Sequence, residues 1–242
     1  MINRILLLKK LACAAGIVLL MAGSANADCV YDTDFTGDTY SQDTGNIVFD
    51  DGTTTAIETW FGSNNGVGIG TAPDDLSFNN TTQNRYRGTG VWLDTTGWLP
   101  GLVTVDVDVS NYVSGADTDI FFQAYSATGV DATNTVSLDL HGAAGLAGAP
   151  MATGTATIGT LGAQQTITAN GTDVPFTFTY NGTDDFVALT FVQENVAGGT
   201  AFGSANLDNL KVNTTSAVPE PSSLALLTAG FGMIGLRRRR LK

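Results

Sequence analysis

The chain has 242 residues, of which 43% are hydrophobic and 14% are charged, and its formal net charge is −12. This length suffices for one domain of ordinary size together with targeting segments. The apolar content argues against global disorder. The negative charge argues against a nucleic-acid-binding protein, because such proteins attract the phosphate backbone with a basic surface.

The charges are distributed unevenly along the chain. The body, residues 28–217, holds three basic residues, Arg85, Arg87 and Lys211, against 22 acidic residues, so its formal charge is −19. The remaining basic residues lie in the first ten and the last six positions. We interpret the acidic body as a surface that keeps the protein soluble outside the cell, with attraction of divalent cations as the alternative.

Residues 1–27 have the three parts of a secretory signal peptide. A basic start precedes the apolar run 11–22, and Ala25 and Ala27 are small residues at the positions that signal peptidase reads. Cleavage is expected before Asp28. The alternative, a first transmembrane helix, is disfavoured because the apolar run is short.

The cysteines predict no disulfide framework. Cys13 lies in the segment that is expected to be removed, and Cys29 then remains alone. One thiol can form neither an internal disulfide nor a cysteine-based metal site. We expect Cys29 to be a spectator, with an intermolecular disulfide as the alternative.

The body has the period-two pattern of β-strands. Val103, Val105, Val107 and Val109 alternate with polar residues, which is typical of a strand with one face in water. Turn residues separate the apolar runs, and no segment of the body has a convincing helical period. The strands expected in chain order are 46–49, 55–60, 103–109, 120–125, 136–140, 174–180, 185–192 and 205–212.

Turns can be placed from the sequence at several points, one of them Asn170-Gly171. Asn181-Gly182 separates two strand patterns, so residues 174–180 and 185–192 are predicted to form a hairpin. A further turn is expected at residues 95–97, between Trp92 and Trp98. The Gly/Ala-rich stretch 142–163 is expected to be a loop with a weak strand near residues 156–158.

The fold class that follows is all-β. We predict an antiparallel two-sheet sandwich, jelly-roll-like, over residues 28–215, flanked by an N-terminal signal helix and a C-terminal transmembrane helix. The closing segment 207–212 resembles the last strand of the sandwiches found in carbohydrate-binding modules.

Calcium is the one cofactor that the sequence suggests. The segment that begins at Asp32 and Asp34, with Asp43 at its twelfth position, resembles the calcium loop of EF-hand and dockerin proteins, although their flanking helices are not predicted here. A second calcium hypothesis joins Asp208 in the last strand to acids such as Asp34. In both, the Asp-rich composition alone is the alternative.

Catalytic and sugar-stacking groups are weakly indicated. The adjacent acids Asp184 and Asp185, like those at 50–51 and 74–75, would point to opposite faces of a strand, so they do not form a glycosidase pair. His141 is the only histidine, and no G-x-S-x-G elbow accompanies it. Five aromatic residues could stack on sugars but are more often core residues: Trp60, Tyr86, Trp92, Trp98 and Tyr112.

The C-terminal segment, residues 216–242, has three parts in order. Val218, Pro219, Glu220 and Pro221 come first, the uncharged stretch 222–236 follows, and Arg237, Arg238, Arg239 and Arg240 begin the basic end at 237–242. As a helix the uncharged stretch would span about 22 Å, at about 1.5 Å per residue. The arginine cluster is expected to stay in the cytoplasm, which leaves the body outside.

This tail resembles the PEP-CTERM sorting signal. The resemblance implies recognition by an exosortase, transient insertion in the inner membrane, cleavage near the Pro-Glu-Pro motif and transfer of the body to the cell surface or extracellular matrix. Such systems belong to Gram-negative bacteria that make exopolysaccharide. The alternative is a permanent stop-transfer anchor of the same topology.

The function expected from these features is that of an exported, non-enzymatic surface or matrix protein, associated with exopolysaccharide or biofilm and binding glycans. The alternatives are a secreted hydrolase of glycans and a structural spacer without a ligand. Signal peptidase and an exosortase are the expected processing partners, and nucleic acid is not expected as a partner.

Overall fold

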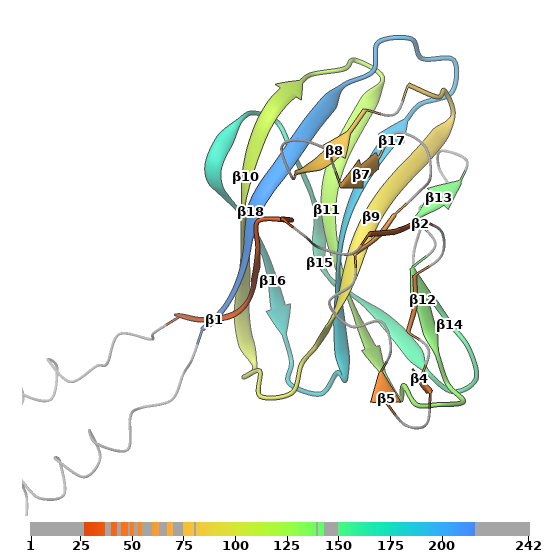
Figure 1. Ribbon diagram of the computed structural model, residues 1–242, viewed down its shortest axis with the longest axis vertical. Coiled ribbons are helices and arrows are strands. Elements are labelled where there is room, and N and C mark those ends of the chain that lie inside the picture. The colour runs from red at the N-terminus through yellow and green to blue at the C-terminus, as the bar shows by residue number, and fades with distance from the viewer. Residues whose placement is uncertain are drawn as a thin grey trace, which may run out of the picture. The chain divides into compact units, whose positions relative to one another are not determined.

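The computed structural model describes residues 27–36, 40–42, 45–47, 49–50, 53–54, 60–62, 67–69, 75–79, 81–138, 140–142 and 150–215. Every regular element in these residues is a β-strand (Figure 1), so the all-β prediction is confirmed. None of the described residues form a helix that is long and apolar enough to cross a membrane. The predicted signal helix and the predicted tail helix lie outside the described residues.

Two larger sheets contain most of the strands. Sheet A has the order β16-β10-β18-β8-β7, with β1 also paired to β18. Its pairs with a printed register are antiparallel. Its strands are β1 (Ala27–Thr33), β7 (Val67–Ile69), β8 (Leu76–Phe78), β10 (Gly101–Val113), β16 (Gly171–Tyr180) and β18 (Ser204–Thr215).

Sheet B has the order β15-β11-β17-β9-β6-β2, and β13 pairs with β9. The pair β2–β6 is parallel, which departs from the antiparallel prediction. Its strands are β2 (Tyr40–Gln42), β6 (Trp60–Gly62), β9 (Arg85–Asp94), β11 (Thr118–Thr128), β13 (His141–Gly142), β15 (Thr157–Thr166) and β17 (Phe186–Asn195).

Two small sheets complete the described fold. One has the order β14-β12-β3, and the other is the pair β4–β5. Their strands are β3 (Gly45–Ile47), β4 (Phe49–Asp50), β5 (Thr53–Thr54), β12 (Val136–Leu138) and β14 (Met151–Ala152).

The main core lies between sheets A and B. Alternate residues of β10 face it, since Val103, Val105, Val107 and Val109 are buried. From sheet B, alternate residues of the almost completely buried strand β17 meet them, among them Leu189 and Phe191. The period-two pattern of the sequence is therefore the alternation between this core and the opposite face of each sheet.

A second, smaller core lies on the other face of sheet B. Leu138 and Leu140, from β12 and the residues after it, pack there with Trp92. Gly88 and Gly90 of β9 let them approach, because a Cβ on Gly88 would lie 2.9 Å from Leu140 Cβ and one on Gly90 would lie 3.1 Å from Leu138 Cδ1. Both faces of β9 and β17 are consequently covered, which explains why neither strand alternates between buried and exposed residues.

The predicted hairpin at Asn181-Gly182 is wrong. Both strands exist, but β16 pairs with β10 in sheet A and β17 pairs with β11 and β9 in sheet B. The turn therefore carries the chain from one sheet to the other. An Asn-Gly pair supplies a residue with positive φ, here Gly182 at 81°, and that geometry serves either kind of turn.

The Gly/Ala-rich stretch also differs from the prediction. The structure has a ten-residue strand, β15, where three weak strand residues were expected. β15 is the edge strand of sheet B, and most of its side chains are exposed. Without a buried face the strand needs no alternation of apolar and polar residues, so the period-two criterion does not detect it.

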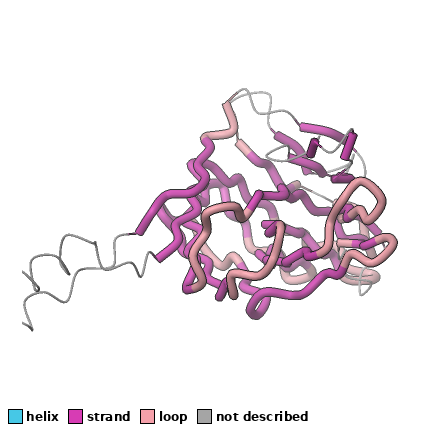
Figure 2. The backbone as a smooth tube through the Cα atoms, turned by 90° about the horizontal axis from the view of Figure 1, so that it is seen from below, coloured by secondary structure: helices cyan, strands magenta, loops and turns pink. Residues whose placement is uncertain are grey.

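The N-terminal strand is fastened by aromatic contacts. The Trp60 indole donates a hydrogen bond to the Tyr31 hydroxyl at 3.0 Å, and the Phe35 ring meets Trp60 edge to face at 5.2 Å. In the ribbon view β1 lies beside β18 (Figure 1), and the tube view shows strands and loops but no helix in the described part of the chain (Figure 2). The first and last strands therefore lie together in sheet A.

Candidate functional site: a pocket between two turns

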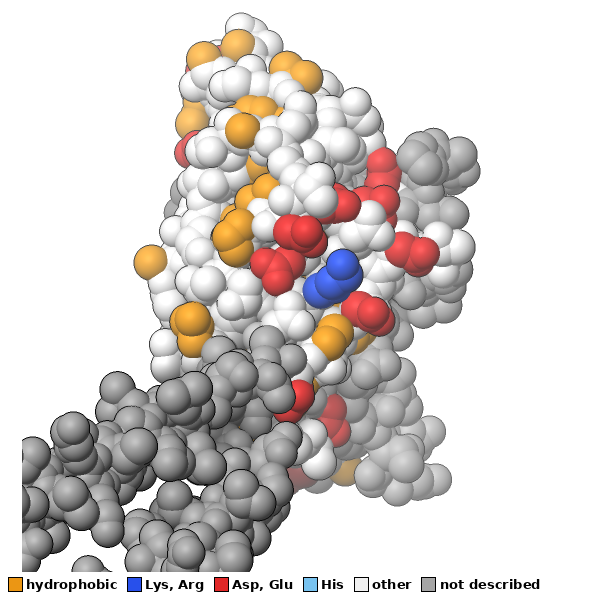
Figure 3. Space-filling view, turned by 90° about the vertical axis from the view of Figure 1, so that its left-hand side faces the viewer, with side chains coloured by type: hydrophobic (Ala, Val, Ile, Leu, Met, Phe, Trp, Pro, Cys, Tyr) orange, Lys and Arg blue, Asp and Glu red, His pale blue; other side chains and the backbone are white. Residues whose placement is uncertain are grey.

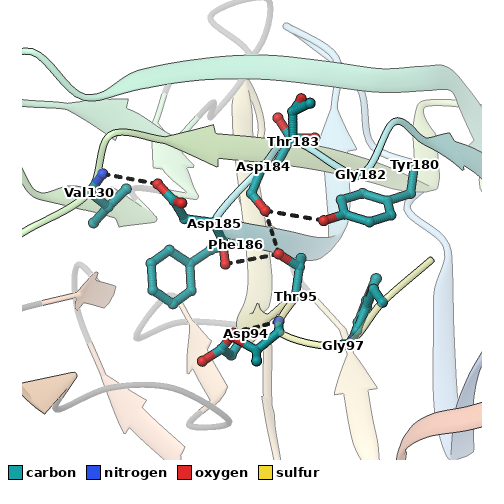
Figure 4. A pocket seen from close by; sticks show the side chains of 12 residues that line it. Asp94, Thr95, Gly97, Val130, Tyr180, Gly182, Thr183, Asp184, Asp185 and Phe186 are labelled. Atoms are coloured by element: carbon teal, nitrogen blue, oxygen red, sulfur yellow. Dashed lines mark hydrogen bonds between the residues drawn. The ribbon is translucent and has the colours of Figure 1, made fainter. Parts of the chain in front are cut away.

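A pocket lies at one end of the sandwich, where chain segments far apart in the sequence meet. One segment links β9 to β10, and another links β16 to β17 (Figure 4). Val130, which follows β11, closes one side. The pocket has a volume of about 520 Å³, and we call it the turn pocket. Its lining residues are Asp94, Thr95, Thr96, Gly97, Trp98, Val130, Tyr180, Gly182, Thr183, Asp184, Asp185 and Phe186.

The first turn confirms the prediction at residues 95–97. The Trp98 N–H donates to the Thr95 carbonyl at 2.9 Å, which closes a four-residue turn. Gly97 has φ 88°, a conformation that glycine adopts without a steric cost. The carboxylate of Asp94 accepts a bond from the Thr96 N–H at 2.7 Å and so holds the start of the turn.

Thr95 joins this turn to the second one. Its hydroxyl donates to the Asp184 carbonyl and lies 3.1 Å from the Asp185 carbonyl (Figure 4). The Tyr180 hydroxyl donates to the same Asp184 carbonyl at 3.2 Å, and the Trp98 ring packs edge to face on Tyr180 at 5.6 Å. The pocket is therefore held by a buried hydroxyl network on an aromatic base.

Two neighbouring carboxylates of the pocket have different environments. Asp184 is 9% exposed, and burial is the main cause that raises its pKa. A hydrogen bond from Ser126 lowers the pKa, and repulsion from Asp185 raises it. Its Oδ2 is buried without a hydrogen-bond partner among the described residues. Asp185 is exposed, and its Oδ2 accepts the N–H groups of Gly129 at 2.7 Å and Val130 at 3.3 Å. The two carboxylates diverge, as expected for neighbours in an extended segment.

The exposed part of the lining is polar. Asp94, Thr96, Thr183 and Asp185 are exposed, and they offer hydroxyl and carboxylate groups to a ligand. Such groups donate to and accept from the hydroxyls of a sugar. A pocket of this volume and polarity suits a small polyhydroxylated ligand better than an apolar one.

The aromatic residues singled out in the sequence do not form a stacking platform. Trp60 and Trp92 are fully buried, and Tyr86 and Trp98 are 7% and 9% exposed. Tyr112 is half-buried against the main core. The core interpretation of these residues holds, and only Trp98 contributes to the turn pocket.

The acids of the predicted calcium sites are partly placed. Asp32 is exposed on β1, and Asp34, just after it, accepts the Thr36 N–H at 2.9 Å. Asp208 is half-buried on β18, which pairs with β1, whereas Asp43 lies outside the described residues. Among the residues that the structure describes, no three His, Cys, Asp or Glu side chains gather closely enough to hold a metal ion.

Most residues of the predicted processing sites lie outside the described residues. This applies to Ala25 and to the two tail groups, Val218, Pro219, Glu220 and Pro221 with Arg237, Arg238, Arg239 and Arg240. Ala27 is described and is the first residue of β1. His141, the only histidine, lies on β13 opposite Arg87.

The outer face of sheet A carries a second group of polar residues. Acidic side chains gather over it (Figure 3), and Asp108 lies opposite Asp208 in the register of β10 and β18. Asp108 accepts bonds from the Asp173 N–H at 2.8 Å and from Asn209 Nδ2 at 2.9 Å. Both bonds lower the pKa of Asp108, and the bond from the Asp173 backbone has the larger effect. The cluster thus ties neighbouring segments together.

The fold and the turn pocket define an all-β sandwich protein with a polar end pocket. Residues 217–240 match the family model described as PEP-CTERM protein-sorting motif. The motif marks the chain as an exported protein that is targeted to the cell surface. No curated protein sequence matches the chain.

Several solved structures are similar in shape to the chain. One is the CBM22-1 xylan-binding domain of Paenibacillus barcinonensis Xyn10C, at 14% identity and TM-score 0.38, covering 81% of this chain and 100% of that one. Another is the C-terminal family 22 carbohydrate-binding module of Clostridium thermocellum Xyn10B, at 13% identity and TM-score 0.33. The match covers 78% of this chain and 95% of that one. A third is the family 11 carbohydrate-binding module of Clostridium thermocellum, at 12% identity and TM-score 0.31. The match covers 80% of this chain and 98% of that one.

The residues of the turn pocket were largely missed by the sequence analysis. Both turns were recognised, but only as turns. Thr95 and Tyr180 stand 85 positions apart in the numbering, and nothing in either local pattern indicates that their hydroxyls meet on the Asp184 carbonyl. The only available indication was that glycine-containing turns end strands on both sides of the pocket.

Proposed function

We propose that this protein is exported through its N-terminal signal peptide, processed by an exosortase-type enzyme at its C-terminal motif, and displayed at the cell surface or in the extracellular matrix. Its acidic sandwich acts there as a non-enzymatic, glycan-binding component of the exopolysaccharide. The observation that carries the proposal is the sorting motif at residues 217–240.

The distribution of charge supports the proposed topology. The basic residues that flank the two apolar segments favour the cytoplasm, and the body between them has a formal charge of −19. An acidic surface with few basic residues resists nonspecific association with anionic polymers. Both ends of the chain thus lead independently to an exported body.

The processing step is tested by mass spectrometry of the native protein. The wild-type protein is expected to begin at Asp28 and to lack the basic tail. Replacement of Glu220 by Gln, together with Pro219→Ala, should leave the tail attached and the protein in the membrane fraction. Ser223→Ala, a change in the same segment outside the motif, is the matched control. A motif variant that is trimmed like the wild type would refute exosortase-type processing.

Glycan binding is assigned to the turn pocket because its exposed side chains are hydroxyl and carboxylate groups in a cavity of about 520 Å³. Sugar hydroxyls bind such groups directly, and Trp98 packs edge to face on Tyr180 at the base of the pocket. The diverging carboxylates of Asp184 and Asp185 do not favour hydrolysis, which requires two carboxyl groups on opposite sides of the scissile bond.

The binding step is tested by sedimentation of the native protein with exopolysaccharide isolated from the same cells. Asp94→Asn with Thr183→Val should reduce the bound fraction, because the first change replaces a charged acceptor with a weaker neutral amide and the second removes a hydroxyl from the pocket. Asp173→Asn, an exposed aspartate outside the pocket lining, should leave it unchanged. Equal sedimentation of all three proteins would exclude the turn pocket, and no sedimentation of any would exclude glycan binding.

A further inference from the structure

Two of the three basic residues of the body lie together. Arg85 and Arg87 are two positions apart in β9, so their side chains leave the strand on the same face. Arg85 is exposed and Arg87 is half-buried. In a body with a formal charge of −19, this is a local concentration of positive charge.

The positive charge of this pair is not balanced within the described part of the chain. Nη1 of Arg87 donates to the Tyr86 carbonyl at 3.2 Å, and its Nε is buried without a partner. Neither guanidinium forms an ion pair with a described residue. Burial, followed by repulsion from Arg85, lowers the pKa of Arg87. A partly buried cation whose Nε has no partner among the described residues is costly, and a bound anion would offset that cost.

The described strand β17, on one side of β9, presents no acid to the pair. Gln193 lies opposite Arg87 and Asn195 opposite Arg85 on β17, and both carry neutral amides. These amides are engaged elsewhere, since Gln193 Nε2 donates to the Gly203 carbonyl at 3.0 Å and Asn195 Nδ2 to the Thr82 carbonyl at 3.1 Å. Glu194, between them, leaves β17 on the opposite face.

We propose that Arg85 and Arg87 bind a carboxylate group of an acidic glycan, such as a uronic acid residue. Guanidinium groups are planar and hold a carboxylate through paired N–H···O bonds. The inference rests on the proposed glycan-binding function and specifies the chemistry of the glycan. A second copy of the chain is the poorer partner, because it would bring a further formal charge of −19 toward the first.

The arginine site is separate from the turn pocket. Arg85 begins β9 and Asp94 ends it, so the two sites are about 30 Å apart along an extended strand. The site also lies away from the point where the chain leaves the sandwich, because Thr214 near the end of β18 pairs with Val103 near the start of β10.

The experiment is calorimetric titration of the full-length protein in detergent with trigalacturonate and with its methyl ester. The ester keeps the shape of the sugar and removes its charge. We expect the acid to bind and the ester to bind at least about tenfold more weakly. Arg85→Gln and Arg87→Gln should each weaken binding of the acid by about tenfold. Lys211→Gln, which removes the third basic residue of the body, should have no effect.

Each outcome bears on the inference. Equal binding of acid and ester, or unchanged binding by the arginine variants, would overturn it. Inorganic phosphate bound more tightly than trigalacturonate would overturn the glycan assignment. Since Arg85 is exposed, its variant keeps the test valid even if Arg87→Gln fails to fold. Retained sedimentation of both arginine variants with exopolysaccharide would leave the proposed function standing while this inference falls.

Discussion

The side-chain amide of Gln165 pairs with the backbone of Thr177 in both directions. Its Oε1 accepts the Thr177 N–H and its Nε2 donates to the Thr177 carbonyl, each at 2.9 Å. Thr177 lies in β16, the edge strand of sheet A, and Gln165 lies in β15, the edge strand of sheet B. One side chain thus occupies a stretch of edge that another strand could otherwise extend.

Replacement of Gln165 by Ala should destabilise the protein by about 1–2 kcal/mol, the usual range for the loss of such hydrogen bonds. It should also promote self-association, because the N–H and carbonyl of Thr177 become free. Denaturant unfolding and light scattering measure the two effects. Gln164→Ala, an exposed neighbour, is the control. Unchanged stability would show that the bridge is not formed in solution.

The buried carboxyl of Asp184 predicts a pH dependence of stability. Burial raises its pKa, and repulsion from Asp185 acts in the same direction. A pKa that is higher in the folded than in the unfolded state contributes stability at low pH that is lost as the pH rises through the folded value. The variant Asp184→Asn has no carboxyl group at this position, so its stability does not fall through this titration.

The melting temperature of Asp184→Asn relative to the wild type should therefore increase between pH 4 and pH 7. Thermal unfolding followed by circular dichroism across this range measures it. Asp173→Asn, at an exposed position, should show no such trend. A constant difference between Asp184→Asn and the wild type would contradict the assignment of a raised pKa.

The close packing of the small sheet on sheet B predicts a steric effect at Gly88. A Cβ there would meet Leu140 Cβ and Val192 Cγ2 at 2.9 Å and the Phe191 carbonyl oxygen at 3.1 Å. Gly88→Ala should therefore cost about 1–3 kcal/mol, as overpacking of a core usually does. Chemical denaturation of the variant beside Thr179→Ala, an exposed change on β16, tests this. A neutral Gly88→Ala would mean that the second core is loosely packed.

The calcium hypothesis gives a prediction on metal addition and removal. If Asp32, Asp34 and Asp43, or Asp34 with Asp208, hold a calcium ion, calcium at about 100 times its dissociation constant should stabilise the protein by about 2.7 kcal/mol. A chelator should reverse the effect, and Asp34→Asn should abolish it. Magnesium at equal ionic strength is the control. A melting temperature that does not respond to calcium would remove the hypothesis.

The sequence predicts strands better than it predicts their partners. The valines from Val103 to Val109 identify β10, because one face of that strand is in the core and the other in water. The same reasoning found β16 and β17 but joined them wrongly, since Asn181-Gly182 serves a turn between sheets as well as a hairpin. Partner choice depends on the packing of the whole sandwich, which no local pattern records.

The candidate sites are harder to predict from the sequence than the strands are. The turn pocket needs Thr95, Tyr180 and Asp184 to meet through the tertiary fold, and each is unremarkable in its own segment. Arg85 and Arg87 are two of the three basic residues of the body, and their spacing in the sequence places them on one face of a strand. What the sequence did not reveal is that neutral amides, not carboxylates, would lie across from them on β17.

The register of β18 on β10 gives the molecule a polarity. The chain leaves its last strand beside Val103, at the turn-pocket end, while β9 begins with Arg85 at the other end. The two candidate sites therefore lie at opposite ends of β9, about 30 Å apart along an extended strand. If both proposed sites bind glycan, one copy of the sandwich can link two polysaccharide chains, so the function of this protein would be that of a cross-linker.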